Sequence, residues 1–174
     1  QHRGVLPDIV TTAKGLTSAT VPMGAVMVRK GIYDAFMGSA GGEKAIELFH
    51  GYTYSAHPLA CAAGLATLET YEEEGLFERA AELAPYWEEA LHSLKGEPHV
   101  IDIRNIGLMG AVELSSRPGK AGERAYDAMI AAFEKGVMLR ITGDTIAMSP
   151  PLIVKKSEID QAIDILRATL RELS

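Results

Sequence analysis

The sequence contains almost no cysteine. Cys61 is the only cysteine among the 174 residues, so the chain cannot form an internal disulfide, and a single thiol is typical of proteins in a reducing compartment. We therefore expect a cytoplasmic protein. The five histidines and this cysteine are scattered without the spacing of a metal-binding motif, so the sequence predicts no metal site.

Long hydrophobic runs and an excess of positive charge are also missing. No run reaches the roughly 18 apolar residues that a membrane-spanning helix needs, and the first residues, Gln1-His2-Arg3-Gly4, lack a charged and then apolar leader. Acidic residues outnumber basic ones by 23 to 17, with a formal net charge of −6. Because no basic blocks occur, we expect neither a membrane nor a nucleic acid as a partner.

The apolar content of 47% is sufficient for the core of one ordinary domain. In the first part of the chain, hydrophobic patterning predicts two neighbouring buried strands, a short helix, a glycine-rich connection and a long helix. These elements are residues 7–13 and 24–29 (strands), 31–37 (short helix), 38–43 (connection) and 58–74 (long helix). Pro58 suits the first turn of the long helix because its φ is fixed, and Gly75 ends that helix.

Beyond Gly75 the pattern changes to alternating helices and short strands, so we place a domain boundary near Tyr71. Apolar residues spaced by three and four predict a core-facing helix over 76–94. The other expected elements are helices at 123–135 and after Ser157, and strands at 100–104, 108–114, 137–140 and 145–148. Ser157 and Asp160 predict a partial capping box for the last helix.

Lys14 is the first candidate for chemistry. It ends an apolar, strand-like run that starts at Asp8, and Gly15 follows it at once. A desolvated lysine amine loses affinity for its proton and becomes a nucleophile that forms an imine with an aldehyde. On this segment alone, however, an ordinary solvated lysine is the favoured interpretation, since most lysines are surface charges.

Four further segments change this interpretation of Lys14. They are Val21 to Val26 (VPMGAV), His50 to Gly64 (HGYTYSAHPLACAAG), Val100 to Asn105 (VIDIRN) and Arg140 to Thr145 (RITGDT). In this order and at these separations the chain resembles the class III aminotransferases, and within that class most closely the ω-amino acid:pyruvate (β-alanine:pyruvate) aminotransferases. The resemblance covers essentially the whole chain.

The resemblance implies an α/β fold that is part of the pyridoxal-phosphate (PLP)-dependent transferase fold type I, like aspartate aminotransferase. Residues 1–70 would end the PLP-binding large domain, and residues 71–174 would form the small C-terminal domain. Family members are more than twice as long, so we expect a carboxy-terminal portion of a larger enzyme. The aspartate that pairs with the pyridine nitrogen, most of the phosphate cup and the aromatic residue that stacks on the ring would precede Gln1.

The resemblance also implies roles for two residues of the first domain. Lys14 would form a Schiff base with pyridoxal 5'-phosphate and then carry a proton between the substrate carbon and the coenzyme. Thr53 would reach the coenzyme phosphate of the neighbouring subunit, which makes a homodimer or dimer of dimers the expected assembly. A hydroxyl before a helix start suits a phosphate, but from the residues alone an N-capping hydroxyl without a ligand is the favoured interpretation of Thr53, because Ser and Thr are common caps.

Arg140 is the expected substrate-binding residue. It ends a predicted strand, and its planar guanidinium matches a carboxylate with two parallel hydrogen bonds. In the family the matching arginine binds the substrate carboxylate. The alternative is a purely structural ion pair between Arg140 and Asp144, which is favoured without the resemblance because surface pairs are common.

The activity that these residues imply is transamination. An ω-amino acid or β-alanine-like amine would give its amino group to pyruvate, with the amine and the keto acid as the small-molecule partners. The alternatives are another class III enzyme, such as a semialdehyde aminomutase or a diamine or ornithine transaminase, and a non-catalytic dimerisation module. Ser18-Ala19-Thr20 departs from the glycine-containing pair often found there in the family, which would affect the pocket shape but not the lysine chemistry.

Overall fold

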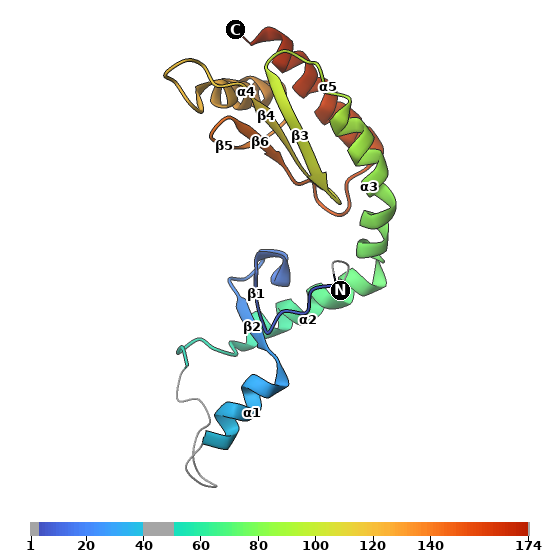
Figure 1. The fold of residues 1–174 in the computed structure, drawn as a ribbon. Coiled ribbons are helices and arrows are strands. Elements are labelled where there is room, and N and C mark those ends of the chain that lie inside the picture. The colour runs from blue at the N-terminus through green and yellow to red at the C-terminus, as the bar shows by residue number, and fades with distance from the viewer. Residues whose placement is uncertain (1–3, 40–50, 174) are drawn as a thin grey trace. The chain divides into compact units, whose positions relative to one another are not determined.

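The computed structural model describes residues 4–39 and 51–173, and the chain divides into two compact units, Gln1–Glu74 and Gly75–Ser174. Figure 1 shows the elements of each unit. The break follows α2 (Pro58–Glu73), so the boundary expected near Tyr71 lies inside that helix. The assignment of the two units to the large and small domains of an aminotransferase stays a prediction.

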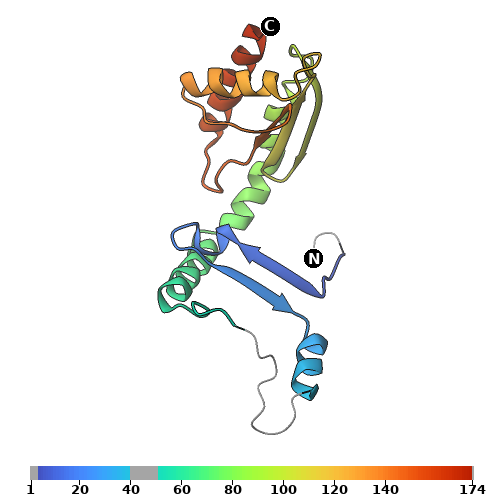
Figure 2. The ribbon, with the colours of Figure 1, turned by 90° about the vertical axis from the view of Figure 1, so that its left-hand side faces the viewer.

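The first unit contains a two-stranded antiparallel sheet, visible as two opposed arrows in Figure 2. Its elements are β1 (Ile9–Ala13), the short 3₁₀ helix η1 (Lys14–Thr17), β2 (Gly24–Val28), α1 (Lys30–Ser39) and α2. The register runs from Ile9 opposite Val28 to Ala13 opposite Gly24, which confirms two neighbouring strands. The expectation that both strands are buried is wrong for the described chain, in which Ile9 of β1 is 55% exposed and Val26 of β2 is 66% exposed, because successive side chains project from the two faces of a sheet and these faces are left partly uncovered.

Two sequence interpretations concern residues at the end of α1. The short helix expected over 31–37 is longer in the structure and reaches Ser39. Most of the expected connection at 38–43, together with His50, lies outside the described residues.

Helix α2 packs closely on η1, the segment that begins with Lys14. A Cβ placed on Gly64 would lie 3.4 Å from the Met23 sulfur and 3.7 Å from the Leu16 carbonyl oxygen. The Tyr71 hydroxyl donates a hydrogen bond of 2.7 Å to the Gly15 carbonyl. Residue Thr17 is 1% exposed. The missing side chain of Gly64 therefore lets α2 lie close against the turn that carries Lys14.

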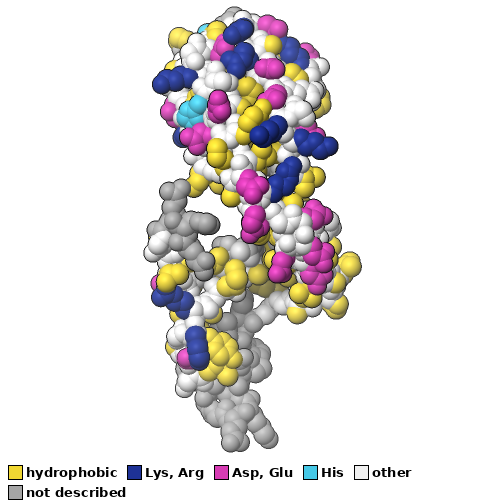
Figure 3. Space-filling view, turned by 90° about the vertical axis from the view of Figure 1, so that its right-hand side faces the viewer, with side chains coloured by type: hydrophobic (Ala, Val, Ile, Leu, Met, Phe, Trp, Pro, Cys, Tyr) yellow, Lys and Arg dark blue, Asp and Glu magenta, His cyan; other side chains and the backbone are white. Residues whose placement is uncertain are grey.

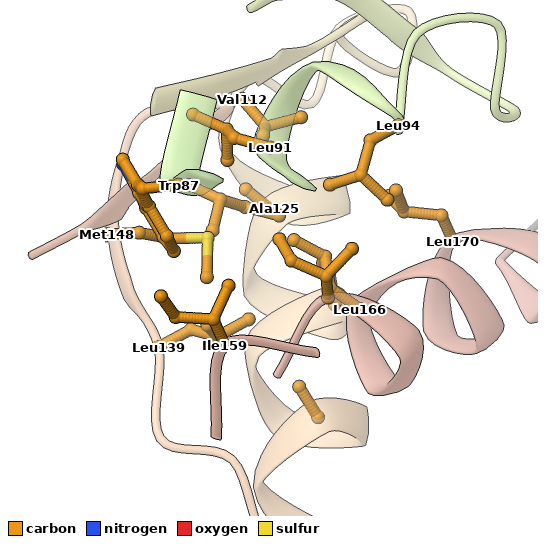
Figure 4. Close-up of a cluster of buried hydrophobic side chains, with 14 of the residues drawn as sticks. Trp87, Leu91, Leu94, Val112, Ala125, Leu139, Met148, Ile159, Leu166 and Leu170 are labelled. Carbon is orange, nitrogen blue, oxygen red and sulfur yellow. The ribbon is translucent and has the colours of Figure 1, made fainter. Parts of the chain in front are cut away.

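The second unit is a four-stranded antiparallel sheet with three helices, and the strand order is β3-β4-β6-β5. Its elements are α3 (Leu76–His92), β3 (Val100–Ile106), β4 (Met109–Leu114), α4 (Glu123–Glu134), β5 (Arg140–Thr142), β6 (Thr145–Met148) and α5 (Lys156–Glu172). Helices and strands share one core, shown in Figure 4, which includes Trp87 and Leu91 of α3, Val112 of β4, Ala125 of α4, Met148 of β6 and Leu166 of α5. Among the described residues, no helix is long and apolar enough to cross a membrane.

The strand expected at 137–140 is wrong. Gly136 has a φ of 93°, its N–H donates to the Phe133 carbonyl, and the Val137 N–H donates to the Ala132 carbonyl at 2.9 Å. These two bonds form a Schellman motif, which ends α4 and uses the backbone of Val137. Pairing with β6 therefore starts only at Arg140, opposite Ala147.

The capping box expected from Ser157 and Asp160 is also wrong. Helix α5 starts at Lys156, and its N-cap is Lys155. The Lys155 N–H donates to the Glu158 carboxylate at 2.7 Å, so the box lies two residues earlier than the serine suggested. Asp160 instead accepts a hydrogen bond from the Tyr86 hydroxyl of α3.

Among the described glycines, Gly110 of β4 is the one at which an added Cβ would lie closest to a neighbouring side chain. A Cβ at Gly110 would lie 2.5 Å from Leu91 Cδ2 and 3.2 Å from the Trp87 ring. We expect Gly110→Ala to lower the free energy of unfolding by about 1–3 kcal/mol, because overpacking forces the neighbouring side chains out of their rotamers. Urea titration followed by the fluorescence of Trp87, the only tryptophan among the 174 residues, measures this effect. Gly31→Ala is the control, because nothing lies within 4 Å of that site, and an equal effect there would contradict the packing argument.

Candidate active site

Lys14 stands directly at the end of β1, where the backbone turns sharply. Its φ is 52°, in the left-handed region that costs a non-glycine residue about 1–2 kcal/mol. The turn is held by the Ala19 N–H, which donates to the Lys14 carbonyl at 3.1 Å, and by the Ser18 N–H, which donates to the Gly15 carbonyl at 3.3 Å. Backbone strain of this kind is concentrated at functional positions, so the geometry marks Lys14 as a candidate.

The Lys14 amine is exposed, and within residues 4–39 and 51–173 it takes part in no ion pair or side-chain hydrogen bond. No carboxylate of the described chain therefore competes for the amine. A reactive lysine is expected to be desolvated, but the described residues do not bury the Lys14 side chain. An unpaired amine at a strand end nevertheless fits the aldehyde of a pyridoxal coenzyme, which needs an amine free of a competing carboxylate.

Thr53 lies in the turn that precedes α2, and its side chain is exposed. The N-cap of α2 is His57, which makes no side-chain capping bond. The alternative interpretation of Thr53 as the capping hydroxyl of this helix is therefore wrong. Residues Tyr52 and Ser55 fix the turn, because the Ser55 N–H donates to the Tyr52 carbonyl at 2.9 Å.

The turn around Thr53 meets the segment after Lys14 in one cavity of about 470 Å³. The cavity is lined by Val21, Pro22, Met23, Gly24, Tyr52, Tyr54, Ser55, Ala56, His57, Ala60 and Cys61. Two of the sequence segments singled out above are thus brought together in the first unit. Neither Lys14 nor Thr53 lines this cavity.

Arg140, in the second unit, is the first residue of β5 and lines a cavity of about 1010 Å³. The other lining residues are mostly apolar, with Ser149 and Glu158 as the polar side chains besides Arg140: Trp87, Met109, Gly110, Met129, Val137, Met138, Leu139, Ile141, Ala147, Met148, Ser149, Pro150, Pro151, Val154, Glu158, Ile159 and Ala162. The walls are largely apolar, as is usual for sites that bind small molecules through a few well-placed polar groups. Arg140 is exposed and, in the part of the chain that the structure describes, forms no ion pair.

The alternative of a structural ion pair between Arg140 and Asp144 does not occur among the described residues. The Asp144 carboxylate accepts hydrogen bonds from the Ser116 hydroxyl at 2.6 Å and the Gly122 N–H at 2.7 Å. These bonds tie Asp144 to the loop before α4 and leave the Arg140 guanidinium for another partner. From the sequence, Asp144 was considered only as a counterion for Arg140, so its actual partners were missed.

The family follows from comparison with known proteins. The class III aminotransferase family model matches residues 1–170. The chain belongs to the class III aminotransferases. This confirms the resemblance drawn from Lys14 and the four segments, and with it the α/β fold of a PLP-dependent transferase, since class III aminotransferases depend on pyridoxal phosphate.

Two class III aminotransferases among the relatives illustrate the match. The chain is 54% identical over 170 residues to an omega-aminotransferase of Caulobacter vibrioides, covering 98% of this chain and 38% of that protein. It is 42% identical over 174 residues to a beta-alanine–pyruvate aminotransferase of Pseudomonas aeruginosa, covering 100% and 39%. The chain therefore spans less than half the length of these class III relatives.

A solved class III structure supports the same fold. An (S)-enantioselective omega-transaminase from Thermomicrobium roseum matches with a TM-score of 0.87 and 36% identity, over 98% of this chain and 38% of that one. Within the present class III chain, Lys14 and Thr53 lie in the first unit and Arg140 lies in the second. The roles of these three residues stay predictions that the geometry above supports at Lys14 and Arg140.

Proposed function

We propose that the protein to which this chain belongs is a PLP-dependent transaminase of the ω-amino acid:pyruvate type. In the net reaction the nitrogen of a β-alanine-like amine replaces the keto oxygen of pyruvate, which becomes alanine, and the donor leaves as an aldehyde or ketone. The observation that carries the proposal is the unpaired amine of Lys14 on a strained turn, in a chain 54% identical to an omega-aminotransferase.

Lys14 would hold the coenzyme through its Nζ and later move a proton at the substrate carbon. Pyridoxal phosphate, when bound, supplies an electron-accepting ring that lets the carbon next to the substrate nitrogen lose its proton. An amine released at the end of β1 is then available as the base and acid for that carbon. The bonds from Ala19 and Ser18 to the carbonyls of Lys14 and Gly15 would keep the turn in place while the side chain changes partners.

Arg140 would orient the acceptor by its carboxylate. Two parallel N–H donors on a planar guanidinium recognise a carboxylate in a fixed orientation, and the apolar walls around Arg140 would favour the small methyl end of pyruvate. When the amine donor occupies the site, Arg140 would accept a distal carboxylate or move aside. Its freedom from internal ion pairs in the described chain is compatible with both positions.

Thr53 would bind the coenzyme phosphate of a second subunit, in a homodimer or a dimer of dimers. The turn that carries it is flanked by exposed apolar side chains: Tyr52 is 76% exposed, Tyr54 80% and Leu59 63%. Figure 3 shows that hydrophobic side chains are exposed on both units. Clusters of this kind mark surfaces that are covered by a partner, which supports an interface around Thr53. The cytoplasm stays our expectation for the location, on the basis of the single cysteine.

The test is the requirement for an acceptor. With the full-length protein, β-alanine and pyruvate, we expect one alanine to form for each β-alanine consumed, and no turnover when pyruvate is omitted. Turnover of an amino-aldehyde substrate without any keto acid would instead identify an aminomutase. No turnover with any amine and keto acid pair, in protein that also takes up no coenzyme, would leave only a dimerisation module.

A further inference from the structure

We infer that Asp144 is a positioning residue for the acceptor. Its hydrogen bonds hold the turn of the β5–β6 hairpin in place and thereby determine where the Arg140 guanidinium lies. The inference rests on the proposed role of Arg140 as the carboxylate-binding residue. It extends that proposal to a residue that touches neither the coenzyme nor the substrate.

The hairpin itself is short and has one defined register. Thr142 of β5 pairs with Thr145 of β6, so Gly143 and Asp144 form a two-residue turn. Gly143 has a φ of 56°, which fits hairpin turns of type II′, where glycine takes the first turn position. Because register in a hairpin is set by its turn, the position of Arg140 opposite Ala147 depends on how this turn is held.

Asp144 attaches the turn to two other parts of the unit. Its carboxylate accepts from the Ser116 hydroxyl, just after β4, and from the Gly122 N–H, just before α4, at 2.6 and 2.7 Å. Its carbonyl accepts from the Leu114 N–H at 2.9 Å. The turn is therefore connected to the end of β4 by main chain and side chain, and to the start of α4 by the carboxylate.

Close packing supports the same attachment. A Cβ on Gly122, whose φ is 85°, would lie 3.6 Å from the Gly143 carbonyl oxygen, so the loop before α4 lies directly against the turn. Arg124, on the first turn of α4, is 9% exposed and donates to the Ser115 carbonyl at 2.7 Å. The buried arginine thus holds the segment that carries Ser116, from which Asp144 receives one of its bonds.

The charge of Asp144 matters as well as its shape. The Ser116 hydroxyl and then the Gly122 N–H lower the pKa of the Asp144 carboxyl below its usual value, and the Arg124 cation acts in the same direction. The carboxylate is therefore ionised at neutral pH, and hydrogen bonds to an ionised acceptor are the stronger ones. An asparagine at this position keeps an oxygen for the two donors but loses this charge.

The Arg140 side chain is held less firmly than the turn beside it, and this difference matters for binding of the acceptor. The β5–β6 turn is held by three hydrogen bonds to Asp144, whereas the Arg140 side chain in the described structure has no ion-pair partner. A fixed backbone with a free side chain lets the guanidinium reach the same point each time it binds a carboxylate. Loosening the turn should therefore weaken recognition of the carboxylate and leave the chemistry on the carbonyl carbon unchanged.

The experiment compares pyruvate with propanal, an acceptor that lacks a carboxylate, using the full-length enzyme and an amine donor without a carboxylate. For Asp144→Ala we expect kcat/KM for pyruvate to fall about tenfold, mainly through KM, because small displacements of a binding group are costly. The value for propanal should stay within about twofold of the unchanged enzyme. Asp144→Asn should give an intermediate loss. Both substrates are measured on the same preparation. A reduced folded fraction therefore cancels in the pyruvate-to-propanal ratio, which is kcat/KM for pyruvate divided by kcat/KM for propanal.

Asp127→Asn is the matched control. Asp127 also lies on α4 and pairs with Arg117, but it makes no recorded contact with the β5–β6 turn. We expect its pyruvate-to-propanal ratio to equal that of the unchanged enzyme. Amide hydrogen exchange of peptides that cover 138–148 should be faster in Asp144→Ala and unchanged in Asp127→Asn.

Arg140→Ala separates failure of this inference from failure of the proposed function. If Arg140→Ala lowers the ratio and both Asp144 variants leave it unchanged, the positioning role is wrong and the carboxylate-binding role of Arg140 stands. Equal losses with pyruvate and propanal in the Asp144 variants would also overturn it, since they would indicate a purely structural aspartate. A ratio that Arg140→Ala does not change would overturn both proposals.

Discussion

Lys14→Ala in the full-length protein should reduce kcat by roughly a thousandfold or more. The substitution removes both the amine that holds the coenzyme and the group that moves the proton, and each such function is worth orders of magnitude in rate. After treatment with borohydride, mass spectrometry of the unchanged protein should find the coenzyme mass on the peptide that contains Lys14. The same peptide of the variant should carry no adduct.

Two further variants define this result. Lys30→Ala removes another exposed lysine of the first unit, one that pairs with Asp34 at 2.6 Å, and should leave both activity and adduct unchanged. Lys14→Arg keeps the positive charge but cannot form the covalent link, so it should behave like the alanine variant. Adduct on a different lysine, or full turnover in Lys14→Arg, would refute the assignment of Lys14.

The second large effect is expected at Arg140. In Arg140→Ala, kcat/KM for pyruvate should fall roughly 100-fold, because a pair of charge-assisted hydrogen bonds to the acceptor carboxylate is lost. The value for propanal should change little, since that acceptor offers no carboxylate. Steady-state kinetics with both acceptors and one carboxylate-free amine measures the two values side by side.

Arg104→Ala is the control for Arg140. Arg104 lies on β3 of the same sheet but bonds to Asp102 and Glu113, at 2.6 and 2.7 Å, and it does not line the Arg140 cavity. Its removal should leave the preference for pyruvate over propanal intact. If Arg140→Ala retained pyruvate saturation like that of the unchanged enzyme, carboxylate recognition would have to come from another residue.

The sequence predicted the elements that have a clear periodicity. The apolar face of α3 follows from side chains spaced by three and four, and β4 from an apolar run, and both elements occur within two residues of the expected bounds. The family and the fold followed from the order of Lys14 and the later segments, which a single motif would not have supported. The position of Lys14 at the end of a strand could likewise be predicted from the sequence, because Gly15 interrupts the apolar run.

The features that were missed depend on contacts between residues distant in sequence or on backbone geometry. Nothing in the residue type indicates that Lys14 adopts a φ of 52°, since lysine rarely does so. Val137 belongs to the apolar run of an expected strand, but its N–H is used in the Schellman motif that ends α4. The partners of Asp144 lie 22 and 28 residues away in sequence, and no local pattern predicts such pairings.

The side chains that line the cavity around Arg140 differ widely in how deeply they are buried. Trp87 is 1% exposed and belongs to the core, whereas Met138 is 84% exposed and lies in the segment between α4 and β5. Substitutions at Met138 would change the shape of the cavity without disturbing the packing on which the sheet depends. Under the role proposed for the Arg140 cavity, Met138 is therefore a position at which laboratory selection can vary the substrate without altering the buried core.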